Sequence, residues 1–168
     1  MQKFDREEYK KYSLENKSKL CPGQAFGKIM TQIAKETPMS LFIESAYDIR
    51  IMLGCMTDMY CDCSKCKKTS NYLFPKKPKV IQQMKQDLIK RWPSFKEDLC
   101  PGSYCLLLIN DLCKPIEDKN SIALITTIGT NFALNYCFCD RCEPGVMDII
   151  KDIDVSSKNK KTKKNLEN

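Results

Sequence analysis

Two stretches of this sequence carry the same cysteine pattern, and that pattern restricts the fold more than any other feature. Each stretch begins with Leu-Cys-Pro-Gly, at 20–23 and 99–102, and ends with Tyr-Cys-x-Cys-x-(Lys/Arg)-Cys, at 60–66 and 136–142. The first two cysteines lie 40 residues apart in one stretch and 37 in the other, a difference that a loop absorbs. The sequence therefore predicts an internal duplication, with two modules of four cysteines each.

Apolar residues recur at helical spacing inside each module. Pro22 and Pro101 suit a first helical turn, and Pro38 and Pro115 interrupt the pattern between two helices. The second helix of the first module should end near Tyr60. Short connections make neighbouring helices antiparallel, so the start of one helix and the end of the other should lie together. We expect two convergent sets of sulfurs: Cys21 with Cys61, Cys63 and Cys66, and Cys100 with Cys137, Cys139 and Cys142.

The remaining segments are arranged around the two modules. No segment alternates apolar and polar residues long enough to predict a pair of strands. An apolar stripe over 79–92, stopped by Pro93, predicts an amphipathic helix that packs on the core. We therefore expect an all-α protein of about six helices, in which this helix joins two duplicated, cysteine-clustered hairpins. The expected segments are a charged N-terminal segment (1–18), the first module (19–70), a linker (71–98), the second module (99–145), a short helix (146–155) and a disordered lysine-rich tail (156–168).

The composition argues against several kinds of enzyme site. The chain contains no histidine, which is the commonest general base and the commonest metal ligand. It has no Gly-x-Ser-x-Gly sequence and no Gly-rich phosphate-binding loop. A repeated group of four thiols also differs from the single activated thiol that nucleophilic catalysis uses. We expect a protein without enzymatic activity.

Four convergent cysteines support two kinds of chemistry. One is a zinc ion held by four thiolates, which gives two zinc sites in this chain. Nearby cations (Lys65, Lys67, Lys68 and Arg141) would offset part of the negative charge of those sites. The other is disulfide bonding, in which case no metal is needed. Both remain open at this point.

The number of cysteines favours zinc. Eleven cysteines divide into four, four and three, whereas disulfides would leave at least one thiol unpaired. Three closely spaced thiols facing one remote thiol also form only one easy pair. Cys55, Cys105 and Cys113 lie in apolar helical stretches, where a cysteine behaves as a small buried hydrophobic residue.

Net charge and terminal sequences give weaker indications of partners and compartment. The chain carries +7, and Lys158, Lys160, Lys161, Lys163 and Lys164 place much of that charge in the tail. This tail is a candidate nucleic-acid or nuclear-import patch, whereas the remaining charge of about +3 does not by itself indicate a nucleic-acid surface. No apolar run reaches the roughly 20 residues of a membrane span, and the charged N-terminus predicts no signal peptide.

Two functional hypotheses follow. The first is an intracellular, including nuclear, zinc-stabilised helical adaptor that binds a protein, or nucleic acid through its basic tail. The second is a disulfide-stapled helical protein of an oxidising compartment, either secreted or in the mitochondrial intermembrane space. It would act there as a binding protein or as a structural subunit of a complex.

Overall fold

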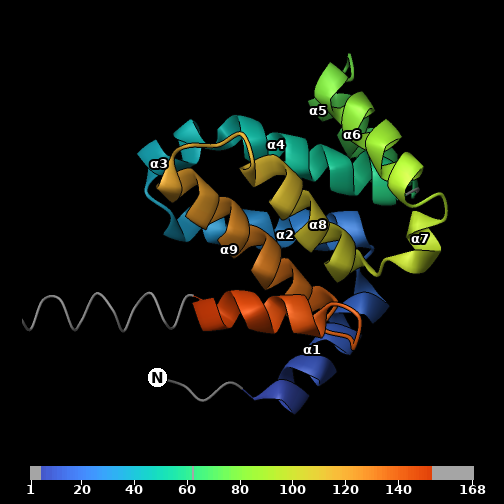
Figure 1. The fold of residues 1–168 in the computed structure, drawn as a ribbon, viewed down its shortest axis with the longest axis vertical. Helices are drawn as coiled ribbons and strands as arrows, with labels where there is room; N and C mark the ends of the chain where they lie inside the picture. Colours follow the sequence, from blue (N-terminus) through green and yellow to red (C-terminus); the bar gives the residue numbers. More distant parts are fainter. Residues whose placement is uncertain (1–4, 62, 153–168) are drawn as a thin grey trace, which may run out of the picture.

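The computed structural model describes residues 5–61 and 63–152, and every regular element in this part of the chain is a helix (Figure 1). This confirms the all-α prediction. The elements are α1 (Arg6–Lys19), α2 (Pro22–Glu36), α3 (Met39–Glu44), α4 (Ala46–Gly54), the π-helix η1 (Cys55–Tyr60), α5 (Ser64–Leu73), α6 (Lys79–Arg91), α7 (Phe95–Asp98), α8 (Pro101–Cys113) and α9 (Lys119–Tyr136). Residues 143–152 are also helical.

These ten elements exceed the predicted number of about six, and the largest difference lies between residues 38 and 60. One continuous helix was expected there, whereas the structure has α3, α4 and η1. One turn residue, Ser45 (φ −91°, ψ 0°), separates α3 from α4, although its backbone stays in the right-handed helical region. Ser45 is fully buried, and its hydroxyl donates to the Ser121 hydroxyl of α9 at 2.9 Å. This tertiary contact has no signal in the local periodicity.

The π-helix η1 leads directly into the first group of three cysteines. The Cys61 N–H donates to the Met56 carbonyl, five residues earlier, at 3.2 Å. In the second module, α9 ends with an ordinary bond from the Cys137 N–H to the Ala133 carbonyl. A π-turn widens a helix by one residue and is often found beside functional sites. The two groups of three cysteines therefore follow helices that end differently.

The connecting segments contain more helix than the sequence predicts. α5 extends to Leu73 and α7 covers 95–98, and neither was expected. The helix predicted over 79–92 is present as α6, which ends at Arg91. The last helical run begins at 143, where 146 was expected, and the predicted residues 153–155 lie outside the described residues. The tail over 156–168 and its five lysines also lie outside them.

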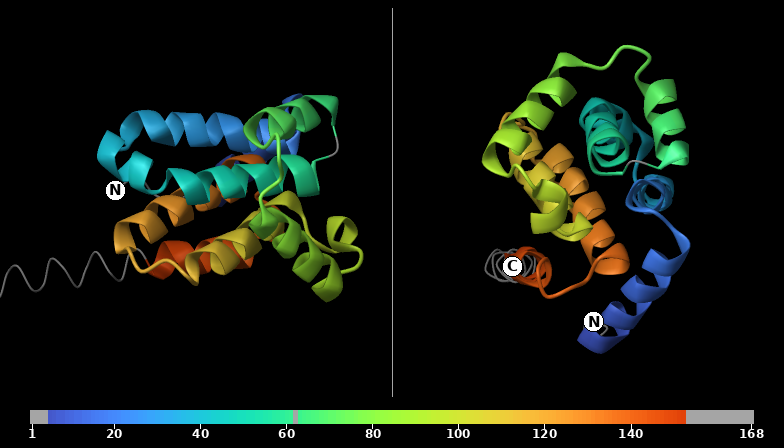
Figure 2. Two further views of the ribbon diagram at one scale, coloured as in Figure 1. Left: turned by 90° about the horizontal axis from the view of Figure 1, so that it is seen from above. Right: turned by 90° about the vertical axis from the view of Figure 1, so that its right-hand side faces the viewer.

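The two modules share one hydrophobic core. α2 and α4 lie in one layer and α8 and α9 in the other (Figure 2), and contacts join α2 to α9 and α4 to α8. The Phe26 ring of α2 meets the Phe132 ring of α9 edge to face, with centroids 5.5 Å apart. Tyr104 of α8 is fully buried, and its hydroxyl donates to the Cys55 carbonyl at 3.3 Å. In the described residues, no helix is both long and apolar enough to cross a membrane.

Candidate metal centres

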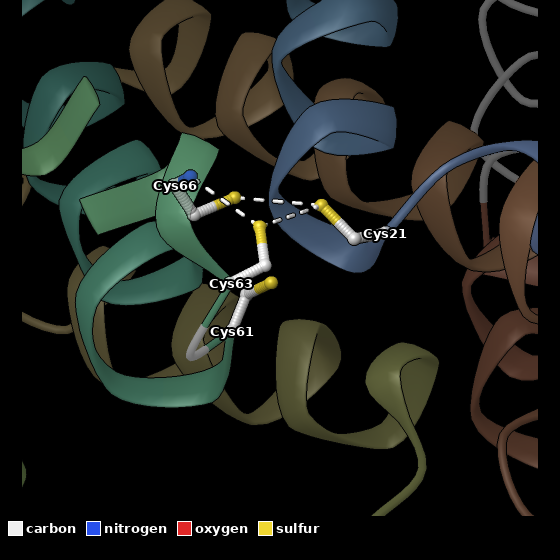
Figure 3. A group of neighbouring side chains, drawn as sticks. All are labelled: Cys21, Cys61, Cys63 and Cys66. Atoms are coloured by element: carbon white, nitrogen blue, oxygen red, sulfur yellow. Dashed lines mark hydrogen bonds between the residues drawn. The ribbon is translucent and has the colours of Figure 1, made fainter. Parts of the chain in front are cut away.

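The first cysteine set forms one cluster at the start of α2 (Figure 3). The four sulfurs all lie within 4.8 Å of one another. The Cys21 sulfur lies 3.5 Å from the Cys63 sulfur and 3.5 Å from the Cys66 sulfur. Cys21 is the N-cap of α2, Cys61 follows η1, and Cys63 and Cys66 belong to the first turn of α5. We call this group cluster one.

The second set forms a matching group, which we call cluster two. Its four sulfurs, from Cys100, Cys137, Cys139 and Cys142, also lie within 4.8 Å of one another. The Cys139 sulfur lies 3.9 Å from that of Cys137 and 3.8 Å from that of Cys142. Cys100 is the N-cap of α8, and the other three follow α9. The predicted convergence of both sets is thus observed, while duplication itself remains a prediction from the sequence.

The sulfur separations suit a metal ion and do not suit disulfides. Zinc–sulfur bonds of about 2.3 Å in a tetrahedron place the sulfurs about 3.8 Å apart. Sulfur–sulfur separations of 3.5 to 3.9 Å within the two clusters lie close to that value. A disulfide needs a sulfur–sulfur distance of about 2.0 Å. All eleven cysteines lie in the described part of the chain, and none forms a disulfide.

Backbone N–H groups at helix starts point at several of these sulfurs. The Cys66 N–H donates to the Cys63 sulfur at 3.4 Å, and the Ser103 N–H donates to the Cys100 sulfur at 3.3 Å. Cys21, Cys63 and Cys100 each cap the N-terminus of a helix, where the helix dipole favours negative charge. Hydrogen bonds from such N–H groups orient the sulfurs and stabilise thiolates.

Each cluster also packs against a glycine that follows its Cys-Pro. A Cβ added to Gly23 would lie 2.5 Å from the Cys66 sulfur, and one added to Gly102 would lie 2.7 Å from the Cys142 sulfur. Real Cβ atoms do not approach other atoms so closely. The Leu-Cys-Pro-Gly motif therefore supplies a ligand, a helix start and an open space for a second sulfur.

Hydrogen bonds and burial divide the thiols of each cluster into stronger and weaker acids. The Cys66 N–H, and more weakly the Cys21 thiol, lower the pKa of Cys63 to about 6. Hydrogen bonds from Cys137 and Cys142 lower the pKa of Cys100 well below its usual range. Burial raises the pKa of Cys66, and the bond to Cys100 raises the pKa of Cys142. Each cluster thus contains one readily ionised thiol, and a metal would displace the protons of the others.

A cation of α1, Lys17, interacts with the thiols of cluster two and was not predicted. Burial lowers the pKa of Lys17, but the negative charges of Cys137, Cys139 and Cys100 outweigh this effect and raise it. Arg6, Lys10 and Lys17 recur at helical spacing, which is the signal that would have identified this face. Arg6 donates to Glu143 at 2.7 Å and Lys10 donates to Asp140 at 3.1 Å.

Among the cations predicted beside the sulfurs, Arg141 makes hydrogen bonds that the sequence did not indicate. The Arg141 guanidinium donates to the backbone carbonyls of Glu97, at 2.8 Å, and Asp98, at 3.5 Å. It therefore joins the cysteine loop to the segment that precedes Cys100. The three lysines around Cys66, namely Lys65, Lys67 and Lys68, are exposed to solvent.

The tyrosine and leucine residues that both cysteine motifs share contact each other across the modules. The Tyr60 hydroxyl donates to the Leu99 carbonyl at 2.8 Å, and the Tyr136 hydroxyl donates to the Leu20 carbonyl at 2.9 Å. In each case the tyrosine before one group of three cysteines binds the residue before the other module's first cysteine. These reciprocal bonds give the tyrosine of each motif a structural role, while the accepting group is the leucine backbone carbonyl.

The three other cysteines lie away from these clusters. Cys55 and Cys105 are fully buried, and Cys113 is partly exposed. Burial raises the pKa of Cys55 to about 12 and also raises that of Cys105. These positions favour packing over thiolate chemistry.

Comparison of the chain with protein-family models, with curated proteins and with solved structures found no match.

Proposed function

We propose that this protein is a zinc-stabilised helical adaptor that holds one zinc ion in each cysteine cluster. The observation that carries the proposal is the convergence of two separate sets of four sulfurs, each within 4.8 Å. Bound zinc would join the start of α2 to α5, and the start of α8 to the segment after α9. Because those joints lie at the ends of the core helices, the free energy of zinc binding would contribute directly to folding.

Several features support zinc over the disulfide-stapled alternative. The four sulfurs of each cluster match the four ligands of a tetrahedral zinc site, and their separations are close to those of such a site. Two disulfides would need much shorter sulfur–sulfur distances. The N–H donors at Cys63 and Cys100 stabilise thiolates, which zinc requires and a disulfide does not.

The adaptor role is non-enzymatic, and its partner is a protein or a nucleic acid. A binding role is supported by large apolar side chains on the surface of α3 and α4, where Met39, Ile43 and Tyr47 are each more than 60% exposed. They follow one another at four-residue spacing, as one face of a helix does. Thiolate clusters that stay reduced suit an intracellular compartment, including the nucleus.

Intact mass measured under native and denaturing conditions tests the proposal. The native protein should exceed the mass of the denatured chain by two zinc ions. The denatured mass should equal that of the fully reduced sequence. A native mass without metal, with a denatured mass two hydrogens lower for each disulfide, would establish the alternative.

A further inference from the structure

The positive charge of this protein is concentrated in one segment. Between Ser64 and Arg91 the chain has eight lysines and one arginine but only one acidic residue, Asp87. This segment therefore carries a net charge of +8, which exceeds the +7 of the whole chain. The low net charge of the chain outside its tail, about +3, does not reveal that positive residues are concentrated in this segment.

This segment forms a band around one end of the α4–η1 helix. α5 and α6 lie on opposite sides of that helix in Figure 2 (right), and both contact η1. On α5, Cys66 and Ser70 face inward and are buried, whereas Lys65 and Lys68 are exposed. On α6, Ile81 and Leu88 are buried. Lys79, Gln83, Gln86 and Lys90 are exposed, and their spacing places them along one outward stripe.

Most of these cations are available to a partner. Among the described residues, two of the nine form ion pairs: Lys77 with Asp58 at 2.6 Å and Arg91 with Asp111 at 2.6 Å. The Lys77 pair holds the turn between α5 and α6 against η1. The other cations in this band are exposed, and within 5–61 and 63–152 they form no ion pair that a phosphate would first have to break.

An aromatic ring lies within the band. Tyr72, at the end of α5, is 85% exposed, which is the highest exposure of any large apolar or aromatic side chain in the described residues. It precedes Lys76, Lys77 and Lys79 by only four to seven residues. An exposed ring beside cations is the arrangement with which proteins bind single strands, because unpaired bases stack on the ring while lysines contact the phosphates.

We propose that the α5–α6 band binds single-stranded nucleic acid, with lysines on the phosphates and Tyr72 stacked on a base. Inside a duplex the bases are stacked on both faces and offer no free face to such a ring, and an anionic membrane would favour an apolar face over the Lys–Gln stripe of α6. The inference rests on the proposed function, because cluster one supplies the N-cap and the first turn of α5 (Cys63 and Cys66) and so fixes the band to the core.

The test measures binding of fluorescent 12-nucleotide single strands by anisotropy, on protein whose zinc content has been counted by native mass spectrometry. The quadruple variant Lys76→Gln, Lys79→Gln, Lys85→Gln, Lys90→Gln should lose about tenfold or more in affinity at low salt. The slope of log K against log salt should become shallower by about 2 to 3, since each phosphate contact contributes about 0.7. The matched control is Lys11→Gln, Lys19→Gln, Lys28→Gln, Lys35→Gln, which removes the same charge elsewhere and should change affinity much less.

Substitution of Tyr72 provides a second test, because it changes the stacking contact without changing the charge of the band. Tyr72→Ala should weaken binding by about 5- to 100-fold, and Tyr72→Phe should preserve it. Three results with zinc-loaded protein would overturn the inference and leave the zinc proposal intact. They are no binding of single strands, an equal loss of affinity in both quadruple variants, or a preference for duplexes or phosphatidylserine vesicles. A protein without zinc would instead contradict the proposed function.

Discussion

Gly23 and Gly102 occupy positions where a sulfur atom takes the space of a side chain. We predict that Gly23→Ala displaces the Cys66 sulfur, reduces the zinc content from two ions to one and lowers the melting temperature. Gly27, one turn later in α2, is the control, because an added Cβ there meets only Leu53 at 4.0 Å. Gly27→Ala should stabilise the helix by about 0.5–1 kcal/mol. Two zinc ions and an unchanged melting temperature in Gly23→Ala would show that the sulfur does not lie against this backbone.

Substitutions can distinguish the cysteines that bind zinc from those that only pack in the core. Cys21→Ser and Cys100→Ser should each lose one zinc ion from a different cluster, because serine is a poor replacement for a thiolate ligand. Cys105→Ala should retain both ions and cost about 1–2 kcal/mol, as expected for a small buried side chain. Zinc counts on the three purified variants measure this difference. Equal zinc loss in all three would contradict the assignment of ligands.

The tyrosines before the cysteine groups stabilise the junction between the modules without binding metal. Tyr60→Phe and Tyr136→Phe should each lower the free energy of unfolding by about 0.5–1.5 kcal/mol, because a backbone carbonyl loses its donor. Zinc content should stay at two. Tyr47→Phe, at an exposed position, should change stability by less than about 0.5 kcal/mol. Denaturant unfolding at fixed zinc concentration compares the three, and equal effects would remove the role assigned to these bonds.

At the scale of elements, α1 is attached to the loop of cluster two by ion pairs as well as by the packing of Tyr9 on Phe138. Arg6 binds Glu143 with two nitrogens, Lys10 lies between Asp140 and Glu143, and the Asn16 side chain donates to the Asn135 carbonyl at 2.8 Å. Metal at cluster two would fix the loop that carries these acids, and so would fix the surface on which α1 rests.

Glu143→Gln tests this attachment. It should destabilise the protein by about 1 kcal/mol at low salt, with a smaller effect at high salt, because exposed ion pairs are weak and screened. Amide hydrogen exchange should show faster exchange in α1. The control Asp148→Asn removes an acid whose pair with Lys151 is fully at the surface, and it should leave α1 unchanged. Unaltered exchange in α1 of Glu143→Gln would mean that other contacts hold this helix.

At the scale of the whole molecule, the sequence predicts those features of the fold that depend on short-range patterns of residues. Helical periodicity and the two cysteine motifs predict an all-α chain and both sulfur clusters, since these follow from helix direction and spacing. The Ser45–Ser121 hydrogen bond joins residues far apart in the chain and has no local signal, whereas the helical spacing of Arg6, Lys10 and Lys17 indicates a basic face on α1 but does not say that this face packs against cluster two. The average charge also conceals the α5–α6 band, because compensating acids lie in other parts of the chain.

The shared core makes both metal centres part of one folding unit. Phe26 and Phe132 pack across the layers, and each tyrosine bond crosses from one module to the other. Loss of metal at either cluster should therefore lower the stability of the whole protein, because the core helices of both modules depend on one another.

Melting curves recorded with chelator alone and with reductant alone test the central claim most directly. If zinc holds the clusters, chelator at neutral pH should lower the melting temperature steeply or unfold the protein, and a non-chelating reductant should leave it unchanged. If disulfides hold them, reductant should cost roughly 2–5 kcal/mol for each bond lost and chelator should have no effect. A protein that resists both reagents would show that the cysteine clusters do not hold this fold together.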